Sequence, residues 1–121
     1  MKPSADGAGF GWIEIAGRRY RHDVVITLDG TVRKRHKKLS KQLYGTSHRI
    51  SEAEAEDVYE PGMAYLLIGG GHFGRVQLSE EARAFFDARG VNVEILPTPE
   101  ASRRWNALEA QGVVALFHVT C

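Results

Sequence analysis

The chain of 121 residues contains one cysteine, Cys121, which excludes an intramolecular disulfide and any metal cluster built on several cysteines. It contains no run of about 18 apolar residues, so we expect no membrane span. Its first six residues lack the apolar core of a secretory signal, and we expect a location in the reducing cytoplasm. With 43% hydrophobic residues and a net charge of +1, the composition excludes a disordered chain.

The length fits one domain. We expect a flexible N-terminus over residues 1–8 and a single α/β domain over residues 9–121. The glycine-rich entry to this domain, residues 7–11, is expected to be flexible as well. Proline is scarce, with four residues, and three of them mark predicted element boundaries at Pro61, Pro97 and Pro99.

The small net charge conceals a segregation of charge along the chain. Residues 17–50 carry ten Lys or Arg and two acids, a local net charge of +8, whereas residues 51–121 carry five Arg and eleven acids, a net of −6. A partner-binding surface is expected at the basic run and the two aromatic rings that follow it: Arg33, Lys34, Arg35, Lys37, Lys38, Lys41, Tyr44 and His48. Three interpretations stay open, namely a solvated face, a site for an acidic protein and a site for nucleic acid.

The first half of the chain has the pattern of a β-meander. Short strands are predicted at 12–15, 19–21 and 24–28, and Asp29-Gly30 predicts a hairpin turn into a returning strand at 31–33. Residues 36–50 are polar, and we expect them to be irregular.

The second half alternates helices and strands. Ser51 and Glu54 have the spacing of a capping box, which predicts a helix over 52–60. Ser79 is expected to cap a helix that ends at Gly90. Thr98 is expected to cap a helix that ends at Gly112 and has Ala101, Trp105 and Leu108 as its apolar stripe. Strands are predicted at 63–68, 91–96 and 113–119. The order βββ followed by αβαβαβ predicts an α/β fold, a sheet with helices packed on it.

Two strand-to-helix loops are the places where an α/β sheet would bind a ligand. The first loop contains three consecutive glycines and the second contains Thr98 between two prolines. Because glycine lets a backbone approach a ligand closely, we expect a small-molecule or anion site here. Its candidate residues are Gly69, Gly70, Gly71, His72, Gly74, Arg75 and Thr98. A dinucleotide fingerprint is excluded, because no helix begins within the glycine pattern.

No catalytic set, metal site or cofactor is predicted from the residues. Adjacent His22 and Asp23 would point to opposite sides of a strand, and Ser47 beside His48 is not a triad. His118 and Thr120 share one face of the last strand. We expect Cys121 to be a structural thiol, because a neighbouring carboxylate disfavours its thiolate.

Six segments in order resemble the adipogenesis-associated Mth-domain family. They run from Gly9-Phe10-Gly11-Trp12-Ile13 through the segments 22–26, 32–48, 68–74 and 96–101 to Phe117-His118-Val119-Thr120-Cys121. The resemblance implies a three-layer fold with a central mixed sheet and an additional N-terminal β-meander layer, and no established enzymatic activity. Its eukaryotic relatives include a mitochondrial complex I assembly factor. This chain departs from the family pattern at Gly70, where a threonine is frequent.

Three functional hypotheses follow. The first is a protein-interaction or assembly-related domain without catalysis, which the basic run and the resemblance favour. The second is a small-molecule or anion-binding protein or enzyme that uses the Gly69–Gly74 loop and Thr98. The third is nucleic-acid binding through residues 33–41.

Overall fold

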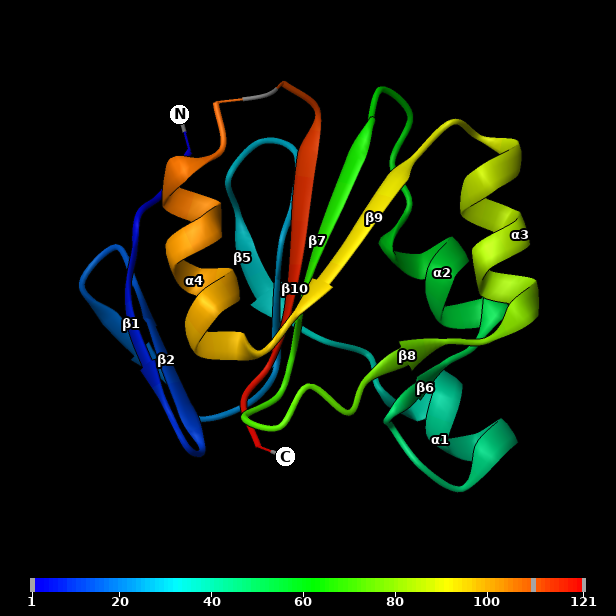
Figure 1. The fold of residues 1–121 in the computed structure, drawn as a ribbon, viewed down its shortest axis with the longest axis horizontal. Coiled ribbons are helices and arrows are strands. Elements are labelled where there is room, and N and C mark those ends of the chain that lie inside the picture. Colours follow the sequence, from blue (N-terminus) through cyan, green and yellow to red (C-terminus); the bar gives the residue numbers. More distant parts are fainter. Residues whose placement is uncertain (1, 110, 121) are drawn as a thin grey trace.

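The computed structural model describes residues 2–109 and 111–120, so Cys121, expected to be a structural thiol, lies outside the described residues. The chain forms a three-layer α/β fold around a five-stranded mixed sheet (Figure 1). Its strand order is β5-β4-β10-β7-β9. The bounds are Val24–Ile26 for β4, Val32–Lys34 for β5, Tyr65–Gly70 for β7, Asn92–Leu96 for β9 and Val113–His118 for β10.

Three of these strands are parallel. β10 pairs in parallel with β7, and β7 with β9, whereas β4 runs antiparallel to β10 and β5 antiparallel to β4. The carboxyl ends of β7, β9 and β10 therefore share one edge of the sheet with the start of β4 and the end of β5. This carboxyl edge is the lower end of the molecule in Figure 1.

Helices cover both faces of the sheet. Helices α2 (Glu52–Val58) and α3 (Glu80–Ala88) pack on one face, where Phe86 and Leu116 are fully buried. Helix α4 (Thr98–Ala107) packs on the other face beside an antiparallel sheet of β1 (Ala5–Gly9), β2 (Trp12–Ile15) and β3 (Arg18–Tyr20). The expected apolar stripe is confirmed, because Ala101, Trp105 and Leu108 are all buried. The predicted helix end at Gly112 is wrong, because α4 ends at Ala107 and Leu108 is its C-cap.

The N-terminus corrects one expectation. The segment predicted to be flexible contains β1, which pairs with β2 and contacts α4. Asn106 on α4 both donates to the Ala5 carbonyl and accepts from the Ala5 amide, at 2.6 and 2.8 Å. Trp105 adds a bond to the Pro3 carbonyl at 2.8 Å. These are long-range contacts that a local sequence pattern does not contain.

Two further expectations are corrected. The predicted β-meander is divided, because β1–β3 form their own sheet and the β4–β5 hairpin joins the central one. Residues 36–50, predicted to be irregular, contain helix α1 (Lys38–Tyr44) and strand β6 (Arg49–Ile50). Strand β6 pairs in parallel with β8 (Gln77–Leu78), so α1 is anchored by a segment distant in the sequence.

Candidate functional site

The carboxyl edge of the central sheet gathers buried polar side chains from four segments. Asp23 stands just before β4, Arg35 just after β5, and His118 at the end of β10. Glu54 reaches the same place from the first turn of α2. All four are buried, with exposed fractions of 5% or less.

Asp23 is the centre of this polar cluster. Its Oδ2 accepts from His118 Nδ1 at 2.8 Å and from Arg35 Nη1 at 3.0 Å, and its Oδ1 accepts from the Val119 amide at 3.0 Å. Burial is the largest influence on the Asp23 carboxyl and raises its pKa. The hydrogen bonds from His118 and Val119 and the charges of His118 and Arg35 outweigh burial and bring the pKa to about 2. Asp23 is therefore ionised at neutral pH.

Arg35 joins Asp23 to Glu54. Its Nε and Nη2 donate to the two carboxylate oxygens of Glu54 at 2.6 and 3.0 Å, and Nη2 also donates to the Ser47 carbonyl at 2.8 Å. Burial opposes the charged guanidinium, but the hydrogen bonds and charges of Glu54 and Asp23 raise the pKa of Arg35 overall. Arg35 was expected on the partner-binding surface, but it is only 2% exposed, so its side chain lies inside the protein and not on that surface.

The predicted capping box at α2 is half correct. The Ser51 hydroxyl accepts from the Glu54 amide at 3.1 Å, as predicted. The Glu54 carboxylate does not return to the Ser51 amide, however, because it binds Arg35 and the Ser40 hydroxyl. The Ser51 amide donates to Ser40 Oγ instead, at 2.9 Å. The residue that looked like a helix cap is thus an anchor of the buried cluster.

The glycine loop and Thr98 meet at the same edge, but they bind each other. The Thr98 hydroxyl accepts from the Gly71 amide at 2.9 Å and donates to the His118 carbonyl at 2.5 Å. The Thr98 amide donates to the Gly71 carbonyl at 3.0 Å. Thr98 is therefore the first residue of α4, after an N-cap at Pro97, rather than the side-chain cap that the sequence predicted.

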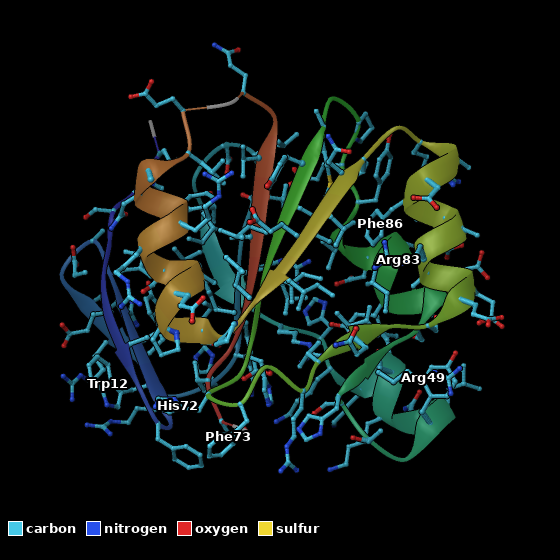
Figure 2. The ribbon with its side chains drawn as sticks, in the orientation of Figure 1. Trp12, Arg49, His72, Phe73, Arg83 and Phe86 are labelled. Carbon is cyan, nitrogen blue, oxygen red and sulfur yellow. The ribbon has the colours of Figure 1, made fainter. Side chains whose placement is uncertain are left out.

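The remaining loop residues are more accessible. His72 is half-buried, and Arg75 is exposed with its guanidinium 5.8 Å from the centre of the Phe73 ring. Phe73 itself is 68% exposed. Across the edge, Phe10 at the tip of the β1–β2 hairpin is 60% exposed, and its ring centre lies 5.7 Å from that of His72. Figure 2 shows His72 and Phe73 together at the lower end of the molecule.

The basic run contains exposed lysines and an arginine that forms an ion pair. Lys34, Lys37, Lys38 and Lys41 are exposed. Arg33 pairs with Asp57 at 3.0 Å. A cavity of about 470 Å³ lies beside the basic run. It is lined by Lys34, Arg35, His36, Lys37, Lys38, Leu39 and Asp57.

The two rings of the predicted partner surface are partly covered. Tyr44 lies under the Arg49 guanidinium, 4.5 Å from its ring centre. His48 packs edge-on against His118, with ring centres 5.2 Å apart. Burial is the main reason that the pKa of His48 is lowered, and the charges of His118, Arg75 and Arg35 contribute. His48 is thus part of the wall of the buried cluster.

Sequence reasoning missed the cluster of Asp23, Arg35, Glu54 and His118. The predicted hairpin did contain a sequence signal for the pair of Asp23 and Arg35. The register pairs Val24 with Lys34, so the next positions outward, Asp23 and Arg35, face each other. A carboxylate opposite a guanidinium, each bordering a short strand, indicates an ion pair. The contributions of Glu54 and His118 depend on tertiary packing.

No group of three or more His, Cys, Asp or Glu in residues 2–109 and 111–120 has an arrangement suited to a metal ion. In the same part of the chain, no helix has the length and apolar character needed to cross a bilayer.

The three-layer α/β fold of this chain is shared with solved structures of other proteins. Residues 5–118 match the family described as protein of unknown function (DUF498/DUF598), and the chain belongs to that family. It is similar over its whole length to the conserved hypothetical protein PH1505 from Pyrococcus horikoshii OT3, with 32% identity, full coverage of both chains and a TM-score of 0.87.

A second solved structure, named MT938, is 34% identical, with a TM-score of 0.81 and coverage of 99% of this chain and 100% of that one. The fold is shared with a Bordetella pertussis protein described as a Mth938-like domain, at 20% identity and a TM-score of 0.72, over 97% of this chain and 85% of that chain. The resemblance to the Mth-domain family is thereby confirmed, and so is the expected three-layer α/β fold.

Proposed function

We propose that this domain is a protein-interaction module that binds an acidic segment of a partner at the cavity within residues 34–39. The observation that carries the proposal is the set of exposed lysines around that cavity. Lys34, Lys37 and Lys38 line it, and Lys41 lies one helical turn further along α1. Among the described residues, none of these four lysines forms an ion pair, so their charges are available to a partner.

The chemistry of the cavity favours a partner segment that carries both acidic and apolar side chains. The aliphatic stems of lysine can cover an apolar side chain while their ammonium groups reach carboxylates. Leu39 contributes an apolar side chain to the lining. The local net charge of +8 over residues 17–50 would also accelerate encounter with an acidic protein. An assembly role, of the kind that the complex I assembly relatives suggest, would be one use of such docking.

The two alternative functions have less support. An anion site at the glycine loop would need free donors, but the Thr98 hydroxyl and amide are already bonded to Gly71 and His118. Single-stranded nucleic acid would need exposed rings for stacking, and Tyr44, the tyrosine that follows the basic run, is partly covered by Arg49. Both alternatives stay predictions, as does the cytoplasmic location.

The test uses immobilised synthetic peptides of aspartate and glutamate, in which one position varies between alanine, leucine and phenylalanine. We expect binding that weakens with salt and is tighter with leucine or phenylalanine than with alanine. The variant Lys37→Glu/Lys41→Glu should weaken binding about tenfold or more. The matched variant Arg83→Glu/Arg103→Glu makes the same change in net charge on α3 and α4, and should bind like the wild type. Equal losses in both variants, or no dependence on the apolar position, would refute the proposal.

A further inference from the structure

The carboxyl edge holds a series of three side chains that the function proposed above does not use. Asp23 Oδ2 lies 2.8 Å from His118 Nδ1, and His118 Nε2 lies 3.2 Å from the hydroxyl oxygen of Thr120. The order is carboxylate, imidazole, hydroxyl, with each group within hydrogen-bond reach of the next. This is the arrangement in which an imidazole accepts the proton of an attacking hydroxyl.

In the neutral form of the His118 ring, the ionised Asp23 determines which nitrogen carries the proton. A carboxylate only accepts hydrogen bonds, so His118 Nδ1 must be the donor to Asp23. His118 Nε2 then presents a lone pair, and the Thr120 hydroxyl is its donor. The His118 nitrogen that faces Thr120 is therefore in the form required of a general base.

Burial decreases from Asp23 to Thr120, so the base is shielded from water while the hydroxyl is open to a substrate. Asp23 and His118 are 5% and 3% exposed, whereas Thr120 is exposed. The backbone around Thr120 is held firmly. The His72 amide donates to the Thr120 carbonyl at 2.8 Å, and the Gly11 amide donates to the Val119 carbonyl at 2.7 Å. A buried, fixed base thus faces an accessible hydroxyl at the edge where parallel sheets bind ligands.

We propose that Thr120 is a nucleophile, activated by His118, that accepts an acyl group from esters of apolar carboxylic acids. The Thr120 oxygen attacks the ester carbonyl while His118 Nε2 takes the hydroxyl proton. The bond from the carbonyl carbon to the alcohol oxygen breaks, and His118 returns the proton to the departing alcohol. Water then cleaves the threonyl ester by the same route and releases the acid. Asp23 is a positioning residue, because it orients His118 without touching the substrate.

The surroundings of Thr120 indicate an apolar acyl group. His72, whose amide binds the Thr120 carbonyl, lies between two exposed phenylalanine rings, with ring centres 5.7 Å from Phe10 and 6.3 Å from Phe73. The rings of Phe10 and Phe73 are 60% and 68% exposed, so they form an apolar surface next to His72, the residue whose amide holds Thr120. An acyl chain lying on them would lose contact with water, which favours binding.

Several charged or titratable groups face His118 from neighbouring elements. Asp23 approaches from the start of β4, Arg35 lies behind Asp23 after β5, and His48 packs on the ring from the segment before β6. Arg75, in the loop after β7, is near enough to His48 to act on its charge. The lowered pKa of His48 keeps that ring neutral at neutral pH, so it does not oppose proton transfer to His118.

The test uses a fluorophosphonate that carries an alkyl chain, with the labelled residue located by mass spectrometry of peptides. Attack by the threonine hydroxyl forms an oxygen–phosphorus bond and expels fluoride, and the proton passes through His118 to solvent. We expect labelling at Thr120 and none at Thr31, an exposed threonine in the β4–β5 turn. Thr120→Ser should be labelled at residue 120, and Thr120→Val should not.

The variants of His118 and Asp23 separate catalysis from structure. His118→Asn should slow the labelling of Thr120 about a hundredfold, the scale of a lost general base. Asp23→Asn should slow labelling and move the pH of half-maximal labelling, which a merely loosened fold would not do. Equal labelling of Thr120 and Thr31, or a His118→Asn variant that reacts at the wild-type rate, would refute the proposal. Arg83→Glu/Arg103→Glu, which changes exposed residues outside both proposed sites, should react at the wild-type rate.

Discussion

Arg35 lies opposite Asp23 across the β4–β5 hairpin, and their side chains form a buried ion pair of 3.0 Å. Their backbones are joined as well, because the Arg35 amide donates to the Asp23 carbonyl at 3.0 Å. Arg35 also binds Glu54 of α2, so one guanidinium connects the central sheet to a helix that covers it. The hairpin, α2 and the end of β10 are therefore coupled through a single charged cluster.

Replacing Arg35 by methionine should strongly destabilise the fold. The change leaves the carboxylates of Asp23 and Glu54 buried without their cation, and breaking a buried pair in this way costs about 3–5 kcal/mol. Urea unfolding would measure the loss. The control is Arg33→Met, which breaks the half-exposed pair with Asp57 and should cost about 1 kcal/mol or less. Similar losses for the two variants would show that the buried cluster adds nothing special to stability.

The lowered pKa of Asp23 predicts a loss of stability in acid. Its pKa falls from 3.8 in the unfolded chain to about 2 in the folded one. The depressed value means that the folded state binds the proton more weakly. The stabilisation is therefore complete above pH 4 and disappears as the pH falls towards 2. It amounts to about 2 kcal/mol.

Unfolding by urea at a series of pH values would show this effect, and Asp23→Asn should flatten the acid limb of the curve. Asp29 is the comparison, because hydrogen bonds from Thr27 and Thr31 also lower its pKa to about 2, but at a fully exposed position. Asp29→Asn should leave most of the acid limb in place. A curve that Asp29→Asn flattens more than Asp23→Asn would contradict the central role given to Asp23.

Gly69 lies where neighbouring atoms leave no room for a side chain, whereas Gly7 has open space around it. A methyl group added at Gly69 would lie 2.8 Å from Phe117 Cδ1 and 3.0 Å from the Thr98 hydroxyl oxygen, and 3.3 Å from the Thr98 backbone. Gly69→Ala should therefore destabilise the chain by about 1–3 kcal/mol, the usual cost of overpacking. The control is Gly7→Ala, where a methyl group would meet nothing within 4 Å. Thermal unfolding of both variants would test this, and a neutral Gly69→Ala would mean that the glycine loop has room to shift.

The sequence predicted those elements that depend on local patterns. The Asp29-Gly30 turn, the serine caps at Ser51 and Ser79 and the apolar stripe of α4 are all present. Helix α1 was missed because it has seven residues and a lysine-rich sequence, and it is held by the pairing of β6 with β8. Glu54 was misread because its role depends on Arg35, 19 residues away, rather than on its own helix.

The candidate site was predictable only in outline. The alternation of strands and helices places the glycine loop and Thr98 at one edge, and the structure has them there, in contact. Nothing local indicates that the Thr98 hydroxyl would bind Gly71 and His118, or that His118 would bind Asp23, 95 residues away. Contacts of this separation depend on the strand order β4-β10-β7, which the sequence pattern leaves open.

The pair of His48 and His118 gives a further prediction. Because burial and neighbouring positive charge lower the pKa of His48, its imidazole should titrate below the 6.5 of an unperturbed histidine. The folded state thus disfavours protonation of His48. Its contribution to stability is present above pH 6.5 and is lost as the pH falls through the lowered pKa. NMR titration of the His48 ring would measure the midpoint directly.

His118→Gln should raise the His48 midpoint part of the way towards 6.5. It removes one source of repulsion and leaves burial, which is the larger cause, in place. Arg75→Gln should raise the midpoint by a smaller amount, since Arg75 ranks after His118 among the causes. A His48 midpoint of 6.5 that is unmoved by His118→Gln would mean that the rings of His48 and His118, although 5.2 Å apart, titrate independently.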